Sequence, residues 1–122
     1  MKLRIKGNSI RFRLSKSEVS KLAVTGYLEE QTLFGETRFV YALQAEEAVN
    51  ELYAKLDQNK ITMFVPVNYV KDWPVNNVVG FEASISLPGG NNLNLLLEKD
   101  FACLDHTTED QSDNYENPNK VC

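Results

Sequence analysis

The sequence predicts an α+β domain, mainly β, in which two hairpin–helix–hairpin repeats form one pseudo-symmetric barrel, followed by a polar C-terminal tail. Three observations predict this fold class. Apolar and polar residues alternate in paired short runs, helix signals follow the first pair of runs in each half, and the whole pattern recurs along the chain. The 122 residues suffice for a single core, and 43% apolar with 25% charged residues is ordinary for a soluble globular chain.

The first half opens with a predicted hairpin and a short helix. Residues 2–14 alternate between apolar and basic positions on either side of the turn dipeptide Gly7-Asn8. Ser15 and Glu18 have the spacing of a capping box, so a helix is expected to begin there and to end at Gly26. Residues 27–34 and 37–44 alternate again and predict a second hairpin.

The second half repeats this plan at a fixed offset of 51 residues, which divides the domain into repeats 1–44 and 52–99. A second helix is expected over 67–73, between Pro66 in its first turn and Pro74 beyond its end. Residues 45–50 link the halves, and one helical turn is expected there. The alternative is a chance register between two β-rich segments. The aligned apolar pairs are Ile5 with Leu56, Ile10 with Ile61, Phe12 with Met63, Leu14 with Val65, and Val19 with Val70.

We expect a single domain over residues 1–103. Residues 104–122 form an acidic tail that is nearly free of apolar residues, so it cannot bury enough surface to offset the entropy of ordering. The tail is either disordered or laid over the domain through Tyr115 and Pro118. The predicted core consists of the inward positions of the strands and helices: Leu3, Ile5, Ile10, Phe12, Leu14, Val19, Leu22, Phe39, Tyr41, Leu43, Leu56, Ile61, Met63, Val65, Val70, Trp73, Leu93, Leu95 and Leu97.

The stretch from Gly7 to Val19 resembles a known motif. It reads Gly-Asn-Ser, then alternating apolar and basic residues, then Lys16 before a short helix, and it is similar to the core motif of the AbrB/MazE-like swapped-hairpin domains. Ser15 departs from the motif, because that family usually has proline there. The resemblance implies a barrel of exchanged hairpins and nucleic-acid binding through their basic residues. The start of the chain is also similar to small uncharacterised bacterial proteins with an RIKGNSIRFRLS-type N-terminus.

Charge is divided unevenly along the chain. Residues 1–26 carry seven basic residues and one acidic residue, a net charge of +6, whereas the rest carries six basic and 16 acidic residues, a net charge of −10. Alternation places the basic side chains on one face of the first hairpin, and Asn8 lies at its turn. This basic face is the candidate binding site, made of Lys2, Arg4, Lys6, Asn8, Arg11, Arg13 and Lys16.

The basic face is suited to phosphate contacts, so a DNA-binding regulator of the AbrB/MazE type is one expected function. The second half lacks such a face, and a chain with one basic hairpin cannot read two symmetric half-sites. We therefore expect first a non-catalytic interaction module. It would bind a protein partner or a second copy through the basic face or the acidic tail. At the aligned positions, Lys6, Arg11, Arg13 and Lys21 are replaced by Asp57, Thr62, Phe64 and Asp72.

Other chemistry is sparse in the sequence. Cys103 and His106 suggest a metal site as a weaker alternative, but structural zinc needs four nitrogen or sulfur ligands and the chain has three. The sequence has no recognisable phosphate loop or nucleophile–base pair, so no enzyme and no cofactor are expected. No apolar stretch has the length of a membrane span or a signal peptide. Two cysteines make no disulfide framework, which predicts a cytoplasmic protein.

Overall fold

The computed structural model describes residues 1–101 and 113–115. Strands hold 56% of these residues and helices 13%, so this part of the chain is mostly β. The elements follow one another as β1 (Lys2–Lys6), β2 (Ser9–Leu14), α1 (Lys16–Thr25), β3 (Tyr27–Phe34), β4 (Thr37–Glu46), β5 (Tyr53–Asp57), β6 (Lys60–Pro66), α2 (Val67–Val70), β7 (Gly80–Ser86) and β8 (Asn92–Lys99).

The strands form two four-stranded sheets. Sheet A has the order β1-β2-β8-β7 and sheet B the order β3-β4-β6-β5. Each sheet places two antiparallel hairpins side by side and joins them by a parallel pair at its centre, β2 with β8 and β4 with β6. Each sheet therefore combines a hairpin from the first half of the chain with a hairpin from the second half.

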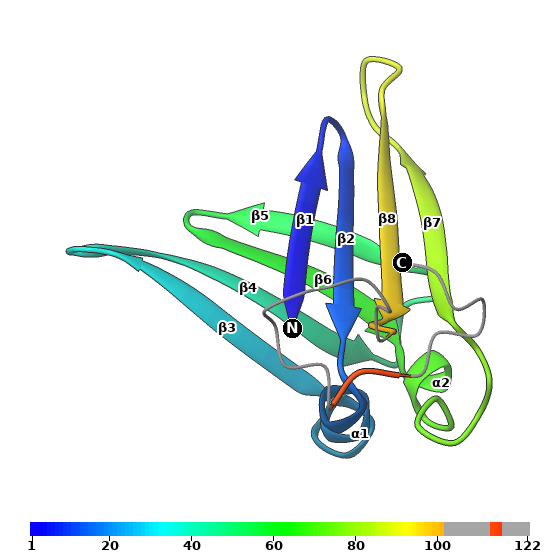
Figure 1. The fold of residues 1–122 in the computed structure, drawn as a ribbon. Helices are drawn as coiled ribbons and strands as arrows, with labels where there is room; N and C mark the ends of the chain where they lie inside the picture. Colours follow the sequence, from blue (N-terminus) through cyan, green and yellow to red (C-terminus); the bar gives the residue numbers. More distant parts are fainter. Residues whose placement is uncertain (102–112, 116–122) are drawn as a thin grey trace.

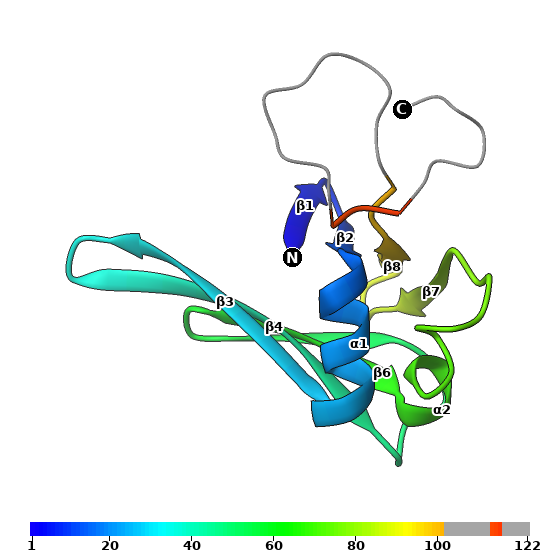
Figure 2. The same ribbon diagram turned by 60° about the horizontal axis from the view of Figure 1, so that its bottom comes forward.

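The two sheets cross each other, and the helices lie at the end of the molecule where β2 finishes (Figure 1). The β3–β4 hairpin extends well beyond sheet A in both views (Figures 1 and 2). Phe12 and Leu97 on one face of sheet A are fully buried in the core, so the opposite face, here called its outer face, points away from the core. No helix in the described part of the chain is both long and apolar enough to cross a membrane.

The predicted fold class is wrong. Neither sheet closes into a barrel, and the predicted hairpin–helix–hairpin repeats are not evident in the described part of the chain. The helices differ, since α1 has ten residues and α2 has four, and residues 71–79 have no regular structure. Residues 45 and 46 continue β4, so the linker forms no helical turn. The parallel pairs satisfy the backbone groups at the inner edge of each hairpin, and β1, β7, β3 and β5 remain sheet edges.

The local signals of the first half are confirmed. Gly7 and Gly26 adopt positive φ angles of 53° and 76°, a region that glycine enters more readily than residues with a Cβ atom. The capping box at the start of α1 is present, with the Ser15 backbone N–H donating to Glu18 Oε1 over 2.9 Å. At the other end, the Gly26 N–H donates to the Leu22 carbonyl over 2.9 Å and closes the helix.

Most predicted core residues are buried between the sheets and helices. Ile5 and Leu56 are exceptions, 53% and 70% exposed, because each lies beside a hairpin turn where few neighbours cover the strand. Trp73 is fully buried, and its indole N–H donates to the Val78 carbonyl over 2.7 Å. The predicted core residues that are buried are Phe12, Leu14, Val19, Leu22, Leu43, Ile61, Met63, Val65, Val70, Trp73, Leu95 and Leu97. Those that are partly buried are Leu3, Ile10, Phe39, Tyr41 and Leu93. The core also holds Leu28, Val40, Ala42 and Leu52, which the sequence pattern did not identify.

Residues 113–115 lie against the end of sheet A and the start of α1. The Ser17 hydroxyl donates to Asp113 Oδ2 over 2.6 Å, and the Tyr115 N–H donates to the Asp100 carbonyl over 2.8 Å. The Tyr115 ring packs on Phe101 and lies 4.9 Å from the ammonium of Lys99, whose pKa is lowered by burial. The rest of the predicted acidic tail, Pro118 included, lies outside the described residues.

The first prediction concerns Glu18. Burial raises the pKa of this carboxyl, but hydrogen bonds from the N-terminal ammonium and the Ser15 N–H outweigh burial and lower it below 4.5. The ionised form is therefore favoured in the folded state. We expect Glu18→Gln to reduce the free energy of unfolding by about 1 kcal/mol near neutral pH. The deficit should shrink as pH falls from 4.5 through the folded pKa, in urea titrations at several pH values. Glu36→Gln, at an exposed turn, is the control, and a deficit that does not change with pH would contradict the assignment.

The second prediction concerns Tyr115. Tyr115→Ala removes the ring that packs on Phe101 and covers Lys99, so the free energy of unfolding should fall by about 1–2 kcal/mol in chemical denaturation. Tyr115→Phe keeps both ring contacts and should match the unmodified chain. Equal stability of the alanine variant would mean that the Tyr115 ring adds nothing to the stability of the folded domain.

Candidate functional site

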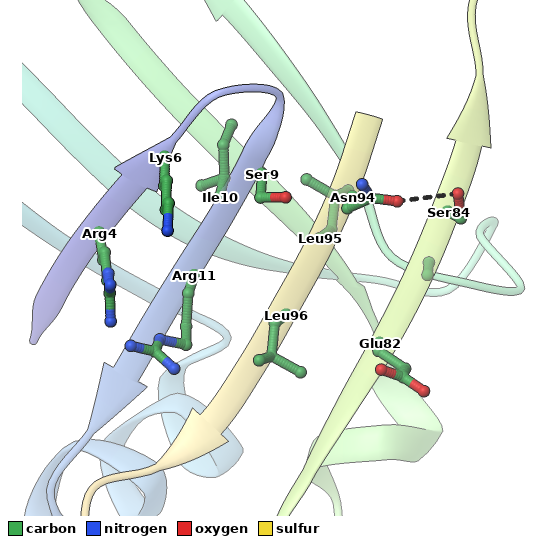
Figure 3. A pocket seen from close by; sticks show the side chains of 11 residues that line it. Arg4, Lys6, Ser9, Ile10, Arg11, Glu82, Ser84, Asn94, Leu95 and Leu96 are labelled. Carbon is green, nitrogen blue, oxygen red and sulfur yellow. Dashed lines mark hydrogen bonds between the residues drawn. The ribbon is translucent and has the colours of Figure 1, made fainter. Parts of the chain in front are cut away.

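The outer face of sheet A is a grid of side chains set by strand register. Arg4 lies opposite Arg11 on β2, Arg11 beside Leu96 on β8, and Leu96 opposite Glu82 on β7. Side chains alternate between the two faces of a strand, so these four residues form one row across the sheet, which we call the charged row. Figure 3 shows Arg4 and Arg11 together at one side, Leu96 between, and Glu82 at the other side.

A second row runs parallel to the charged row, one step toward the hairpin turns. It contains Lys6, Ser9, Asn94 and Ser84, taken from β1, β2, β8 and β7 in that order. The Ser84 hydroxyl and the Asn94 side-chain oxygen are 3.0 Å apart and hydrogen-bonded, as drawn in Figure 3. This contact holds the polar end of β7 and β8 together.

The two rows line a trough of about 680 Å³ on the outer face of sheet A. Its β1–β2 side is cationic, its floor contains the partly buried Leu96, and its β7 side carries Glu82 and Ser84. Clefts that hold small ligands or short peptide segments have volumes of this order. The trough is therefore large enough for such a ligand, and it is cationic on one side and acidic on the other rather than uniformly basic.

Two arginines share one carboxylate, that of Glu98, beside the trough. Arg13 Nε lies 2.8 Å and Arg11 Nη1 3.5 Å from Glu98 Oε1. Burial and then the neighbouring Arg13 lower the pKa of Arg11, Glu98 raises it, and Arg4 lowers it again. Arg4 and Lys6 form no ion pair with any residue in the described part of the chain. The positive charges of Arg4 and Lys6 on the cationic side of the trough are thus not neutralised by an ion pair within residues 1–101 and 113–115.

The structure separates the seven residues predicted from the sequence. Arg4, Lys6 and Arg11 line the trough, and Arg13 adjoins it through Glu98. Lys2 pairs with Asp100 over 3.0 Å, at the end of β1 far from the turn. Asn8 Nδ2 donates to the Asn92 carbonyl over 2.9 Å and ties the two hairpin turns together, and Lys16 lies at the start of α1 against Tyr115. These last three contacts belong to the fold.

The part of the trough on β7 and β8 was missed by the sequence analysis. Glu82, Ser84, Asn94 and Leu96 come from strands that are more than 65 residues away from the basic hairpin along the chain. Their alternation was visible, but nothing local indicated that β8 would pair with β2. Only the parallel pairing brings them beside Arg11.

The weaker metal prediction rests on residues that the structure does not describe. Cys103 and His106 lie outside the described residues. Within 1–101 and 113–115, no group of three or more histidine, cysteine, aspartate or glutamate residues is placed to hold a metal ion.

Comparison with known proteins identifies a family. A family of unknown function, DUF7009, matches residues 1–119, and the chain belongs to it. No curated protein and no solved structure is significantly similar to the chain.

The third prediction concerns Arg4 on β1, which lies directly opposite Arg11 on the adjacent strand β2. Like charges in this position are destabilising, so Arg4→Gln should raise the free energy of unfolding by about 0.2–1 kcal/mol at low salt. The gain should shrink as salt rises, because salt screens exposed charges. Lys71→Gln, an exposed lysine outside the trough, should have no such effect. A clear loss of stability in the Arg4 variant would mean that Arg4 serves the fold instead.

Proposed function

We propose, for this member of a family of unknown function, that it is a non-catalytic interaction module whose trough binds a carboxylate-bearing segment of a partner protein. The observation that carries the proposal is the facing pair of Arg4 and Arg11 at the cationic side of the trough. A cross-strand pair of like charges costs stability in the free protein, and an anion bound between the two guanidinium groups removes that cost.

The chemistry of the pair supports a carboxylate. A guanidinium presents a planar set of donors that matches both oxygens of a carboxylate, and such charge-assisted pairs are stronger than neutral hydrogen bonds. Arg11 is already held by Glu98, so less side-chain freedom is lost on binding. Lys6, on the same side one row away, adds a further positive charge without a fixed geometry.

DNA binding is the second candidate, and one observation favours it. The cations lie on a two-stranded hairpin, a shape that β-ribbon proteins place in a groove of DNA, as the resemblance to AbrB/MazE-like domains implies. Three features oppose it. Arg13 and Lys2 are committed to Glu98 and Asp100, Glu82 stands at the other side of the trough, and the chain outside residues 1–26 has a net charge of −10. We therefore place DNA second.

The compartment belongs to the same proposal. The two cysteines make no disulfide framework, and the start of the chain is similar to that of small bacterial proteins, so we place the module in the bacterial cytoplasm. A homodimer, in which an acidic segment of a second copy fills the trough, is the other form that this interaction could take.

The fourth prediction tests anion choice. A capped glutamate-rich peptide and a mixed-sequence DNA duplex are titrated at about 50 mM salt into isotope-labelled protein, followed by NMR. The peptide should shift the signals of β1, β2 and β8, and Arg4→Gln should weaken its binding about tenfold or more. Lys71→Gln is the matched control and should bind as the unmodified chain does.

Each other outcome has a defined meaning. DNA binding that falls steeply with salt and is lost in Arg4→Gln would overturn the proposal in favour of the second candidate. Peptide binding that is unchanged in Arg4→Gln would remove the trough as its site. Analytical ultracentrifugation of the protein without peptide tests the homodimer. A dimer held by the trough should sediment as a dimer in the unmodified chain and as a monomer in Arg4→Gln.

A further inference from the structure

The far side of the trough carries a charge that the proposed function does not use. Glu82 is exposed on β7, and it forms no ion pair with any residue in the described part of the chain. It lies at the other end of the charged row from Arg4 and Arg11, with Leu96 between them. Figure 3 shows the Glu82 carboxylate on the strand farthest from Arg4.

Strand spacing explains why these opposite charges do not neutralise each other. Arg11 and Glu82 are two strands apart, a separation of about 10 Å between their backbones. Arg11 instead pairs with Glu98 on the adjacent strand. The row therefore keeps a cationic end and an anionic end apart, with an apolar side chain at its middle.

We infer, resting on the function proposed above, that the ligand is a dipolar polypeptide segment, with a carboxylate, an apolar group and a cationic side chain in that order. It lies across the strands, with its carboxylate between Arg4 and Arg11, its apolar group on Leu96 and its cation at Glu82. An extended segment advances about 3.3 Å per residue and turns every second side chain to the same face, so acidic, apolar and basic residues at positions i, i+2 and i+4 all face the row and span about 13 Å.

This arrangement selects by repulsion as well as attraction. A ligand laid in the opposite direction meets like charges at both ends, and a polyanion meets Glu82 wherever it covers the whole row. The second row reinforces the same polarity, because Lys6 stands on the β1 side while Ser84 and Asn94 offer only neutral groups on the β7 side. Glu82 is thus the residue that distinguishes a dipolar segment from an acidic one.

The experiment compares three capped heptapeptides that differ at two positions. Their central residues are Glu-Ala-Leu-Ala-Lys, Glu-Ala-Leu-Ala-Glu and Lys-Ala-Leu-Ala-Lys, and each is titrated by NMR into the full chain, Glu82→Gln, Glu82→Lys and Arg4→Gln. The mixed peptide should bind the unmodified chain about two- to fivefold more tightly than the acidic peptide, as expected for one exposed ion pair. Glu82→Gln should abolish this preference, and Glu82→Lys should reverse it in favour of the acidic peptide. Glu36→Lys makes the same charge change at the exposed β3–β4 turn and should leave the preference intact.

The outcomes separate this inference from the function on which it rests. If both glutamate-containing peptides lose binding in Arg4→Gln but no Glu82 variant changes their ratio, the proposed function stands and the dipolar ligand is wrong. If Arg4→Gln changes nothing, both fail. Tightest binding of the doubly basic peptide would also overturn the inference, because Glu82 alone would then attract the ligand.

Discussion

The parallel pairing of β2 with β8 is the interaction on which the rest of sheet A depends. It joins residues 9–14 to residues 94–99, and the hairpins on either side have no other strand contact within their sheet. On its inner face this pairing sets Phe12 beside Leu97, both fully buried. On its outer face it sets Arg11 beside Leu96, which is the centre of the trough. Core and site are thus two faces of one ladder.

The close contact at the start of β7 shows how tightly the neighbouring β7–β8 pair is built. A Cβ atom at Gly80 would lie 2.5 Å from the Leu97 carbonyl oxygen and 2.8 Å from the Glu98 Cβ. No side chain fits there, so β7 lies directly against β8, and no β7 side chain stands opposite Glu98. Glu98 therefore forms its ion pairs with Arg11 and Arg13 on β2. The arginines are thus held on the β1–β2 side of the sheet, away from Glu82 on β7.

The sequence predicted individual elements better than their assembly, for a physical reason. Alternation around Gly7-Asn8 and the Ser15–Glu18 capping box depend on neighbours in the chain, and both are present as predicted. Strand alternation marks which residues share a face, but it does not indicate which strand lies alongside. The repeat suggested a symmetric barrel, whereas pairing across the halves gave two open sheets with a short α2.

The same limit explains what was predicted of the site. The basic hairpin was identified because its cations are local in sequence, and Arg4, Lys6 and Arg11 do line the trough. Their counterpart Glu82 and the floor residue Leu96 depend on long-range pairing and could not be found from the sequence. Lys2 and Asn8 were included among the site residues because their partners, Asp100 and the Asn92 carbonyl, are equally distant along the chain.

The register between β2 and β8 determines both the stability of sheet A and the position of the residues in the trough. A slip of one residue between β2 and β8 would turn Arg11 toward the core and Phe12 toward solvent, which burial of Phe12 strongly opposes. The hydrophobic core therefore enforces the placement of Arg11, although Arg11 itself faces Arg4 at a cost in stability. Burial of the apolar core holds Arg4 and Arg11 side by side in the free protein, although the two charges repel each other. The pair is therefore preorganised for an anion, because binding requires no further free energy to bring the two guanidinium groups together. The asymmetry of charge along the sequence thus becomes an asymmetry across one sheet, with its cationic and anionic ends separated by two strands.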